Sequence, residues 1–155
     1  MADFGRELLA CAVEGAGPDG QNPLRHVADL PPRPGRRHAW PQWADPDVVQ
    51  AFVDRGIEVP WSHQYTAADL AHGGRHVVLS TGTASGKSVA YQLPILTALK
   101  DNSRSRALYL SPTKALGHDQ LRAAVALTEA VPALRDVAPS SYDGDSSADV
   151  RRFAR

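Results

Sequence analysis

The chain has 155 residues, 43% of them apolar, which is enough for the core of one domain at most. Its 17 Lys and Arg balance 17 Asp and Glu, so no bulk charge draws the protein toward nucleic acid or a membrane surface. One cysteine excludes an internal disulfide and a cysteine-based zinc cluster, and no run approaches the ~20 apolar residues of a membrane span. We therefore expect a soluble cytoplasmic protein.

Residues 1–44 are expected to form a loosely ordered, Pro- and Gly-rich leader. Seven of the 12 prolines fall within the first 46 residues, and hydrophobic periodicity is weak apart from a short helical pattern over residues 4–13. We place the start of the ordered domain at residue 45, so that this domain covers residues 45–155.

Two helices are predicted at the start of this domain. In ADPDVVQAFVDRG, Asp45 can cap a helix, Pro46 suits its first position, and Gly56 can end it. A second helix is predicted from Ser62, as its cap, to His72, where two glycines follow.

The remaining pattern alternates between strand and helix. HVVLS at 76–80 and RALYLS at 106–111 have the length and composition of buried strands, and helices are predicted over 87–100 and 114–129. Because strands that alternate with helices pair in parallel, we predict an α/β fold with a parallel sheet.

The sequence TGTASGKS lies between the first predicted strand and the helix that follows it. This context suits a phosphate-binding loop, or P-loop, because backbone N–H groups and a helix N-terminus both favour a bound anion. Lys87 would reach the β and γ phosphates of a nucleotide, and the Ser88 hydroxyl would coordinate Mg²⁺. A structural turn is the alternative interpretation, and the strict pattern has glycine where this chain has Thr81. The candidate nucleotide-binding residues of the loop are Thr81, Gly82, Thr83, Ala84, Ser85, Gly86, Lys87 and Ser88; the last two are the candidate catalytic residues, and Ser88 is the candidate metal ligand.

Four stretches together resemble the helicases of superfamily 2. TGTASGKS is similar to their motif I, although Thr81 replaces an alanine and Ala84 a glycine of the usual A-x-T-G-x-G-K-[ST] form. GIEVPWSHQ, which ends at Gln64, has the G-x-x-x-P-x-x-x-Q spacing of the Q motif. SPTKALGHDQ at 111–120 resembles motif Ia, and YDGD at 142–145 lies where these proteins have their next nucleic-acid-contacting segment. The sequence of the ordered domain most resembles the YprA-like branch of the DEAD/DEAH-box ATP-dependent helicases.

This resemblance implies a RecA-like domain that binds ATP and Mg²⁺ and acts on single-stranded nucleic acid, for which we expect DNA. It implies that Gln64 pairs with the edge of adenine, since an amide is both a donor and an acceptor. It also implies that Pro112, Thr113 and Lys114 hold a phosphate of the strand. Helix capping by Thr113 and a plain turn at 142–145 are the alternative interpretations.

ATP hydrolysis in this family needs an apolar strand ending in Asp-Glu, and no such stretch follows the loop. We therefore expect a truncated helicase, the N-terminal part of a larger ATPase, that is inactive alone. A P-loop nucleotide-binding or interaction module that never hydrolyses ATP is the alternative, while a P-loop kinase is disfavoured because it leaves the motif Ia stretch without a role. His72 and His76 are separated by two glycines, so we expect no metal site there.

Overall fold

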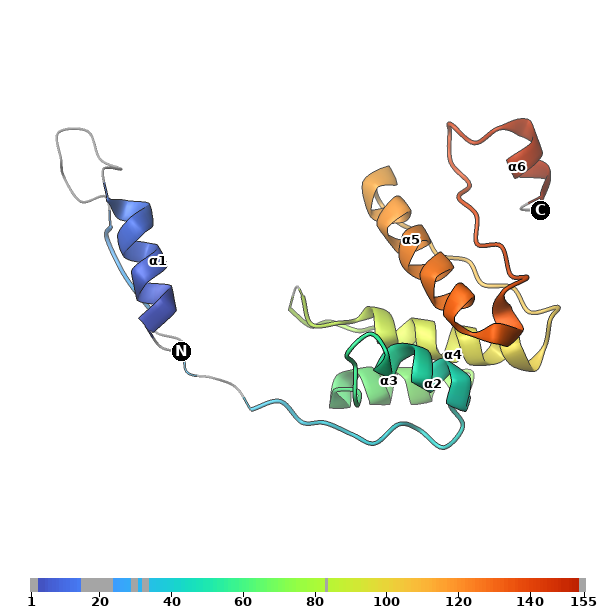
Figure 1. Cartoon of the computed structure of the whole chain (residues 1–155), viewed down its shortest axis with the longest axis horizontal. Helices are drawn as coiled ribbons and strands as arrows, with labels where there is room; N and C mark the ends of the chain where they lie inside the picture. Colours follow the sequence, from blue (N-terminus) through green and yellow to red (C-terminus); the bar gives the residue numbers. More distant parts are fainter. Residues whose placement is uncertain (1–2, 15–23, 29–30, 32–33, 83, 154–155) are drawn as a thin grey trace. The chain divides into compact units, whose positions relative to one another are not determined.

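The computed structural model describes residues 3–14, 24–28, 31, 34–82 and 84–153 (Figure 1). The chain divides after Pro34 into two compact units. The first unit holds α1 (Asp3–Val13), which confirms the helical pattern predicted over residues 4–13. The second unit begins at Gly35 and holds every other helix of the described residues.

The second unit is built from helices. They are α2 (Pro46–Val53), α3 (Ser62–His72), α4 (Ser88–Asp101), α5 (Lys114–Ala130), the 3-10 helix η2 (Pro132–Leu134) and α6 (Ala148–Phe153). α4 packs against α3, α2 and η2, while α5 packs against α2 and η2. The four helices predicted for this part of the chain are confirmed, with small differences at their ends.

Asp45 begins α2, as predicted. Its carboxylate accepts hydrogen bonds from the backbone N–H groups of Asp47 and Val48 at 2.9 and 3.3 Å, and it pairs with the Lys100 ammonium at 2.7 Å. Burial alone would raise the pKa of Asp45, but the hydrogen bonds from Lys100 and the two amides hold this pKa below its usual range. Because Lys100 lies in the last turn of α4, the pair joins the start of α2 to the end of α4.

The start of α3 differs from the prediction by one residue. Trp61, rather than Ser62, is the capping residue, and its N–H donates to the side-chain oxygen of Gln64 at 2.8 Å. The side chain of Gln64, three residues further on, therefore accepts the hydrogen bond of the capping residue's N–H, as glutamine does in a capping box. Gly74, with φ of +74°, follows the end of the helix, as the two glycines in the sequence indicated.

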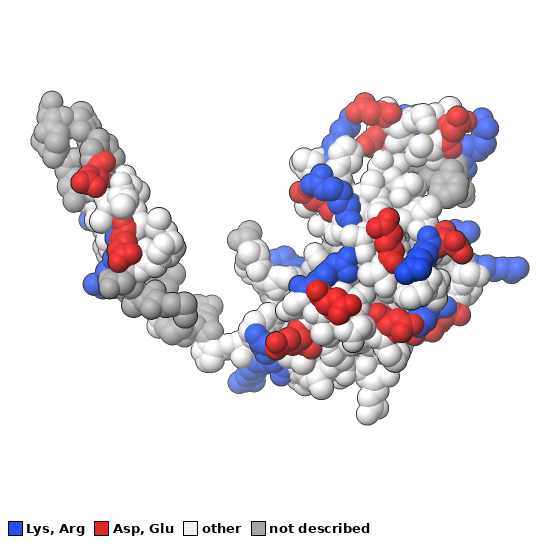
Figure 2. Space-filling view, in the orientation of Figure 1, with Lys and Arg blue, Asp and Glu red and all other residues white. Residues whose placement is uncertain are grey.

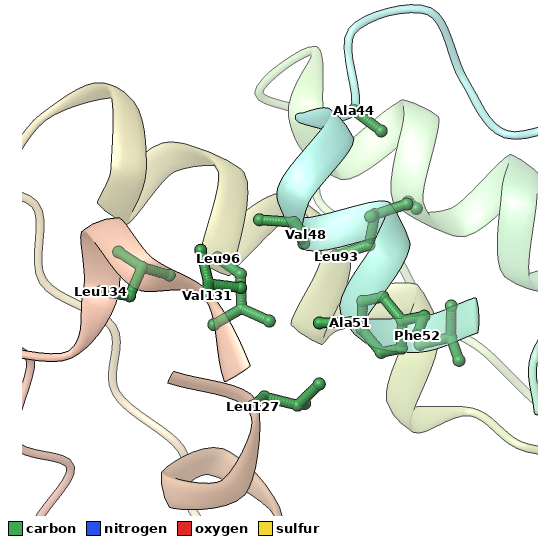
Figure 3. Packing of buried hydrophobic residues seen from close by; sticks show 11 residues of the cluster. Ala44, Val48, Ala51, Phe52, Leu93, Leu96, Leu127, Val131 and Leu134 are labelled. Carbon is green, nitrogen blue, oxygen red and sulfur yellow. The ribbon is translucent and has the colours of Figure 1, made fainter. Parts of the chain in front are cut away.

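The hydrophobic core lies between α2, α4 and the C-terminal end of α5 (Figure 3). Val48, Ala51 and Phe52 recur at the spacing of one helix face, and Phe52 is only 2% exposed. The buried apolar side chains of the cluster are Ala44, Val48, Ala51, Phe52, Ala68, Val89, Leu93, Leu96, Leu127, Val131 and Leu134. This packing holds the first turns of α4 in place, and the loop before α4 is the candidate site.

The predicted parallel sheet is wrong. The described residues contain no β-strand, and their single β-bridge, between Arg37 and Trp61, is antiparallel. The segments 76–80 and 106–111 were predicted as strands, yet Val78 is 95% exposed and Leu108 is 82% exposed.

The error has a physical reason. Apolar and β-branched residues favour an extended backbone, but a strand forms only where a second backbone lies about 4.8 Å away and completes the ladder. Residues 76–80 lead into the loop before α4 and residues 106–111 lead into α5, and neither segment supplies the other with that partner (Figure 1). The α/β, RecA-like class predicted from the sequence is therefore replaced by a helical arrangement of the described residues.

Charged side chains of both signs are interspersed over the face drawn in Figure 2. Neither sign dominates this face, so an anion would have to be held by local groups rather than by a broad field. Within the described parts of the chain, every helix is too short or too polar to cross a membrane.

Candidate nucleotide and nucleic-acid site

The described residues 81–82 and 84–87 belong to the loop immediately before α4. Gly86 has φ of +71° and Ala84 has φ of +56°, so both residues adopt left-handed backbone conformations. Glycine adopts this conformation at little cost, whereas for an L-residue such as alanine it costs about 1–2 kcal/mol. Ala84 thus occupies a conformation that suits the glycine of motif I. Thr83, also predicted to bind nucleotide, lies outside the described residues.

Lys87 folds back onto this loop. Its ammonium donates hydrogen bonds to the carbonyls of Thr81 and Gly82 at 2.8 and 2.6 Å, and to the hydroxyls of Thr81 and Ser85, each at 3.3 Å. The two hydroxyls are themselves hydrogen-bonded at 2.7 Å. All of these partners are neutral oxygens. A phosphate oxygen can replace them with a stronger, charge-assisted hydrogen bond.

Two adjacent side chains of α3 hold the other side of the loop. The Gln64 side-chain nitrogen donates to the carbonyl of Gly86 at 2.8 Å, and His63 Nε2 lies 2.9 Å from the carbonyl of Ser85. Gln64 is only 3% exposed, and a Cβ atom on Gly86 would lie 2.5 Å from its side-chain nitrogen. Glycine at position 86 is therefore needed both for the backbone conformation and for the approach of Gln64.

Sequence reasoning did not find His63. Its partner is a backbone carbonyl, which every residue type carries, so the loop sequence contains no sign of the contact. The available signal is the position of His63 directly before Gln64, because adjacent side chains in the first turn of one helix can reach adjacent residues of the same loop.

Ser88 is the first residue of α4 and directly follows Lys87. Among the described residues, no group of three or more His, Cys, Asp or Glu side chains is arranged to hold a metal ion. A single hydroxyl suits Mg²⁺ as one ligand of about six, because Mg²⁺ is usually bound through few protein groups together with water and substrate phosphates. Ser88 therefore fits a metal ion that arrives with a nucleotide. His72, in contrast, is stacked on Trp43 with 4.0 Å between the ring centres.

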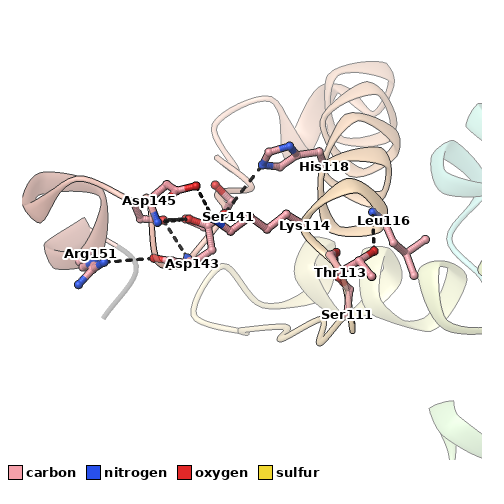
Figure 4. Close-up of polar contacts among 10 residues, drawn as sticks. Ser111, Thr113, Lys114, Leu116, His118, Ser141, Asp143, Asp145 and Arg151 are labelled. Atoms are coloured by element: carbon pink, nitrogen blue, oxygen red, sulfur yellow. Dashed lines mark hydrogen bonds and ion pairs between the residues drawn. The ribbon is translucent and has the colours of Figure 1, made fainter.

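The predicted nucleic-acid-binding residues lie at the start of α5 (Figure 4): Pro112 and Thr113 precede the helix, and Lys114 is its first residue. The Thr113 hydroxyl accepts a hydrogen bond from Leu116 N at 3.3 Å and so caps α5, and the Ser111 hydroxyl donates to the Thr113 carbonyl at 2.6 Å. The structure therefore includes the capping role of Thr113 that was the alternative interpretation. Pro112 and Lys114 are exposed on either side of it.

The YDGD turn lies beside the first turns of α5 (Figure 4). The Lys114 ammonium pairs with the Asp145 carboxylate, and His118 Nε2 lies 3.9 Å from a carboxylate oxygen of Asp143. Asp143 also accepts a hydrogen bond from Asp145 N at 2.9 Å, and this bond is the main reason why the pKa of Asp143 lies below its usual range. Arg151 of α6 donates to the Asp143 carbonyl at 3.2 Å. The structure thus brings together the two segments that the sequence linked to nucleic acid.

Known proteins resemble this chain over most of its length. Residues 61–154 match the family described as DEAD/DEAH box helicase. The chain is 36% identical over 128 residues to the uncharacterized ATP-dependent helicase YprA of Bacillus subtilis, a match that covers 82% of this chain and 17% of that protein. It is 32% identical over 132 residues to the ATP-dependent helicase HRQ1 of Saccharomyces cerevisiae, a match that covers 85% of this chain and 12% of that protein. The chain therefore spans less than a fifth of the length of these relatives.

Solved structures of a helicase also match this chain. The crystal structure of the DUF1998 helicase MrfA bound to DNA matches with a TM-score of 0.74 and 35% identity, over 80% of this chain and 17% of that chain. The structure of MrfA bound to DNA and AMPPNP matches with a TM-score of 0.71 and 36% identity, over the same shares. The matched family region covers more than half of the chain and includes the loop before α4 and the segment before α5. This chain belongs to the DEAD/DEAH box helicase family, as its four motifs predicted.

Proposed function

We propose that the chain binds Mg-ATP at residues 81–88 and single-stranded DNA at residues 112–114, as part of a helicase that couples ATP hydrolysis to movement along the strand. The position of Lys87 carries this proposal, because its ammonium lies at the start of α4 and is surrounded by neutral loop oxygens. The names of the relatives, which are ATP-dependent helicases, support ATP as the nucleotide. The AMPPNP complex of MrfA supports it as well.

Nucleotide binding at this loop is an exchange of partners. Lys87 would release the carbonyls of Thr81 and Gly82 and take up oxygens of the β and γ phosphates, which are stronger acceptors because they are charged. The first N–H groups of α4 point toward the same end of the helix and add favourable partial charge. Ser88 would provide one ligand to Mg²⁺, which when bound neutralises charge on the phosphates. No described carboxylate has to be displaced from Lys87 for this exchange.

The contacts of Gln64 are compatible with its proposed role in adenine recognition. One hydrogen of its side-chain nitrogen is donated to Gly86, and its side-chain oxygen accepts one hydrogen bond from Trp61. An amide has a second hydrogen and a second lone pair, but Gln64 is 3% exposed, so pairing with a base edge requires that its side chain be uncovered when the nucleotide binds. We therefore retain the proposal that Gln64 favours adenine, in addition to its contact with the loop.

Lys114 is the proposed contact for the phosphate backbone of the strand. It is paired with Asp145, but the side chains are 54% and 81% exposed, and such surface pairs stabilise a protein by at most about 1 kcal/mol. A strand phosphate can therefore displace the Asp145 carboxylate at little cost. The DNA in both MrfA crystal structures favours DNA over RNA as the strand.

Replacing Lys114 with alanine should weaken binding of single-stranded DNA to a similar degree for different sequences. Removal of one phosphate-neutralising charge should flatten the slope of log affinity against log salt by about 0.7, because fewer counterions are released. Replacing Asp145 with asparagine should have the opposite effect on affinity, because it removes the competing carboxylate. Fluorescence anisotropy of labelled oligonucleotides, measured over a series of salt concentrations, would detect both changes.

Arg122 provides the control for this experiment. It lies on α5 about 12 Å along the helix from Lys114, and its side chain is 77% exposed. Arg122→Ala removes one positive charge from the same helix and should change affinity less than Lys114→Ala does. Equal effects of the two substitutions, or altered sequence preference at a constant salt slope, would contradict the proposed contact.

The alternative function is a module that binds nucleotide without hydrolysing it. Both functions require Mg-ATP binding, so only turnover distinguishes them. ATP hydrolysis should be measured with single-stranded DNA present, for this chain and for a longer protein that contains it. Turnover in the longer protein would support the helicase, and binding without turnover in both would support the module.

A further inference from the structure

Adjacent side chains on the first turn of α3 hold adjacent carbonyl groups of the loop. His63 Nε2 lies 2.9 Å from the Ser85 carbonyl oxygen, and the Gln64 side-chain nitrogen lies 2.8 Å from that of Gly86. A carbonyl oxygen can only accept a hydrogen bond, so the Nε2 atom of His63 must carry a proton and donate it. Both contacts therefore run from an α3 donor to the loop backbone.

The geometry of the peptide bond makes these two contacts directional. In a trans peptide the C=O of one residue and the N–H of the next point in opposite directions, and the described residues contain no cis peptide. Because the Ser85 and Gly86 carbonyls point toward α3, the N–H groups of Gly86 and Lys87 point away from it. Neither N–H donates a hydrogen bond to another residue that the structure describes. Two neighbouring donors are thus directed away from α3 and are available to an anion.

We propose that His63 is a positioning residue for nucleotide binding. It fixes the peptide between Ser85 and Gly86 so that the Gly86 N–H, beside that of Lys87, can meet a phosphate oxygen of a nucleoside triphosphate. This inference rests on the proposed function of the loop as a phosphate site. His63 itself does not touch the phosphate and acts only through the backbone that it holds.

Several contacts other than that of His63 hold α3 in place. Ala67 and Ala68 of α3 are 6% and 0% exposed, and the helix packs against α4. Further along α3, Asp69 accepts a hydrogen bond from Trp43 Nε1 at 2.8 Å. Substitution of the half-buried His63 should therefore change the loop and leave the helix in place.

The matched variants His63→Gln and His63→Met test the proposal in the full chain. Glutamine and methionine have similar length and volume, but only glutamine has an N–H donor that can reach the Ser85 carbonyl. The methionine variant should bind Mg-ATP about tenfold more weakly than the wild type, and the glutamine variant should stay within about threefold of it. Isothermal titration measures both affinities. Equal weakening in the two variants, or wild-type affinity in the methionine variant, would overturn the proposal.

Trypsin cleavage after Lys87 provides a second measurement that needs no nucleotide. A loop released from His63 opens more often, so the methionine variant should be cleaved there several times faster than the wild type, and the glutamine variant at the wild-type rate. Cleavage after Lys100, near the end of α4, reports opening of the helix and should not change. If the wild type does not bind Mg-ATP, the proposed function fails, and cleavage alone then decides whether His63 positions the loop. Identical cleavage after Lys87 in all three proteins would show that it does not.

Discussion

Replacing Lys87 with alanine should lower the affinity of the chain for Mg-ATP at least tenfold, which corresponds to about 1.4 kcal/mol. The Lys87 ammonium already reaches neutral oxygens of Thr81 and Gly82 at 2.8 and 2.6 Å, and the proposed phosphates would take their place. Alanine leaves the phosphates without this charge-assisted partner. Isothermal titration of the purified protein with Mg-ATP measures the loss.

AMP serves as the internal control for this experiment, because Lys87 is proposed to meet the β and γ phosphates, which AMP lacks. The affinity for AMP should therefore change little. Lys87→Met keeps most of the aliphatic stem but not the charge, so it should match the alanine variant. Unchanged Mg-ATP affinity in a folded variant, or an equal loss for AMP and ATP, would contradict the proposed role of Lys87.

Replacing Gly86 with alanine should both destabilise the chain and impair nucleotide binding. At φ of +71°, a residue with a Cβ atom costs about 1–3 kcal/mol, and that atom would lie 2.5 Å from the side-chain nitrogen of Gln64. Gln64 would have to move and give up its hydrogen bond to the Gly86 carbonyl. For a chain of this size the melting temperature should fall by about 2–4 °C for each kcal/mol, which thermal unfolding followed by circular dichroism would detect.

Ala84 provides the opposite substitution in the same loop. Its φ of +56° is left-handed, so Ala84→Gly removes strain while it adds conformational freedom to the unfolded chain. The net effect should be a stabilisation of up to about 1 kcal/mol, with Mg-ATP affinity maintained. If both substitutions changed the melting temperature in the same direction, the left-handed conformations assigned to the loop would be wrong.

The helices and the loop could be predicted from the sequence because their signals are local. Asp45 and Gly56 act within one turn of the helix that they begin or end, and the two glycines after His72 do the same. The glycine at position 86 likewise has a left-handed φ, a conformation that glycine adopts at little cost. Local signals of this kind hold wherever the segment lies in the fold.

The sheet could not be predicted in the same way because pairing is not local. The β-branched run at 76–80 and the apolar run at 106–111 indicate a backbone preference, but they do not identify a partner. In the structure the two segments are unpaired among the described residues, and Val78 and Leu110 are 95% and 81% exposed. The alternation of strand-like and helix-like patterns predicts a sheet, but a sheet forms only where the backbones of two strands lie side by side.

Two contacts at the site also depend on distant parts of the chain. His63 reaches a backbone carbonyl, which leaves no signature at Ser85. Lys114 and Asp145 are 31 residues apart, and each is one of many charged residues that could have formed a pair. The resemblance placed both of their segments near nucleic acid, but it did not indicate that the Lys114 ammonium would form an ion pair with the Asp145 carboxylate.

The backbone amides of Gly86, Lys87 and Ser88 offer the most direct test of phosphate binding at this loop. In a ¹⁵N-labelled chain, their chemical shifts should change in a saturable way as Mg-ATP is added, and should stay unchanged with adenosine, which has no phosphate. Saturable changes confined to residues outside 81–88, or equal responses of these three amides to Mg-ATP and adenosine, would contradict binding of the triphosphate at the start of α4.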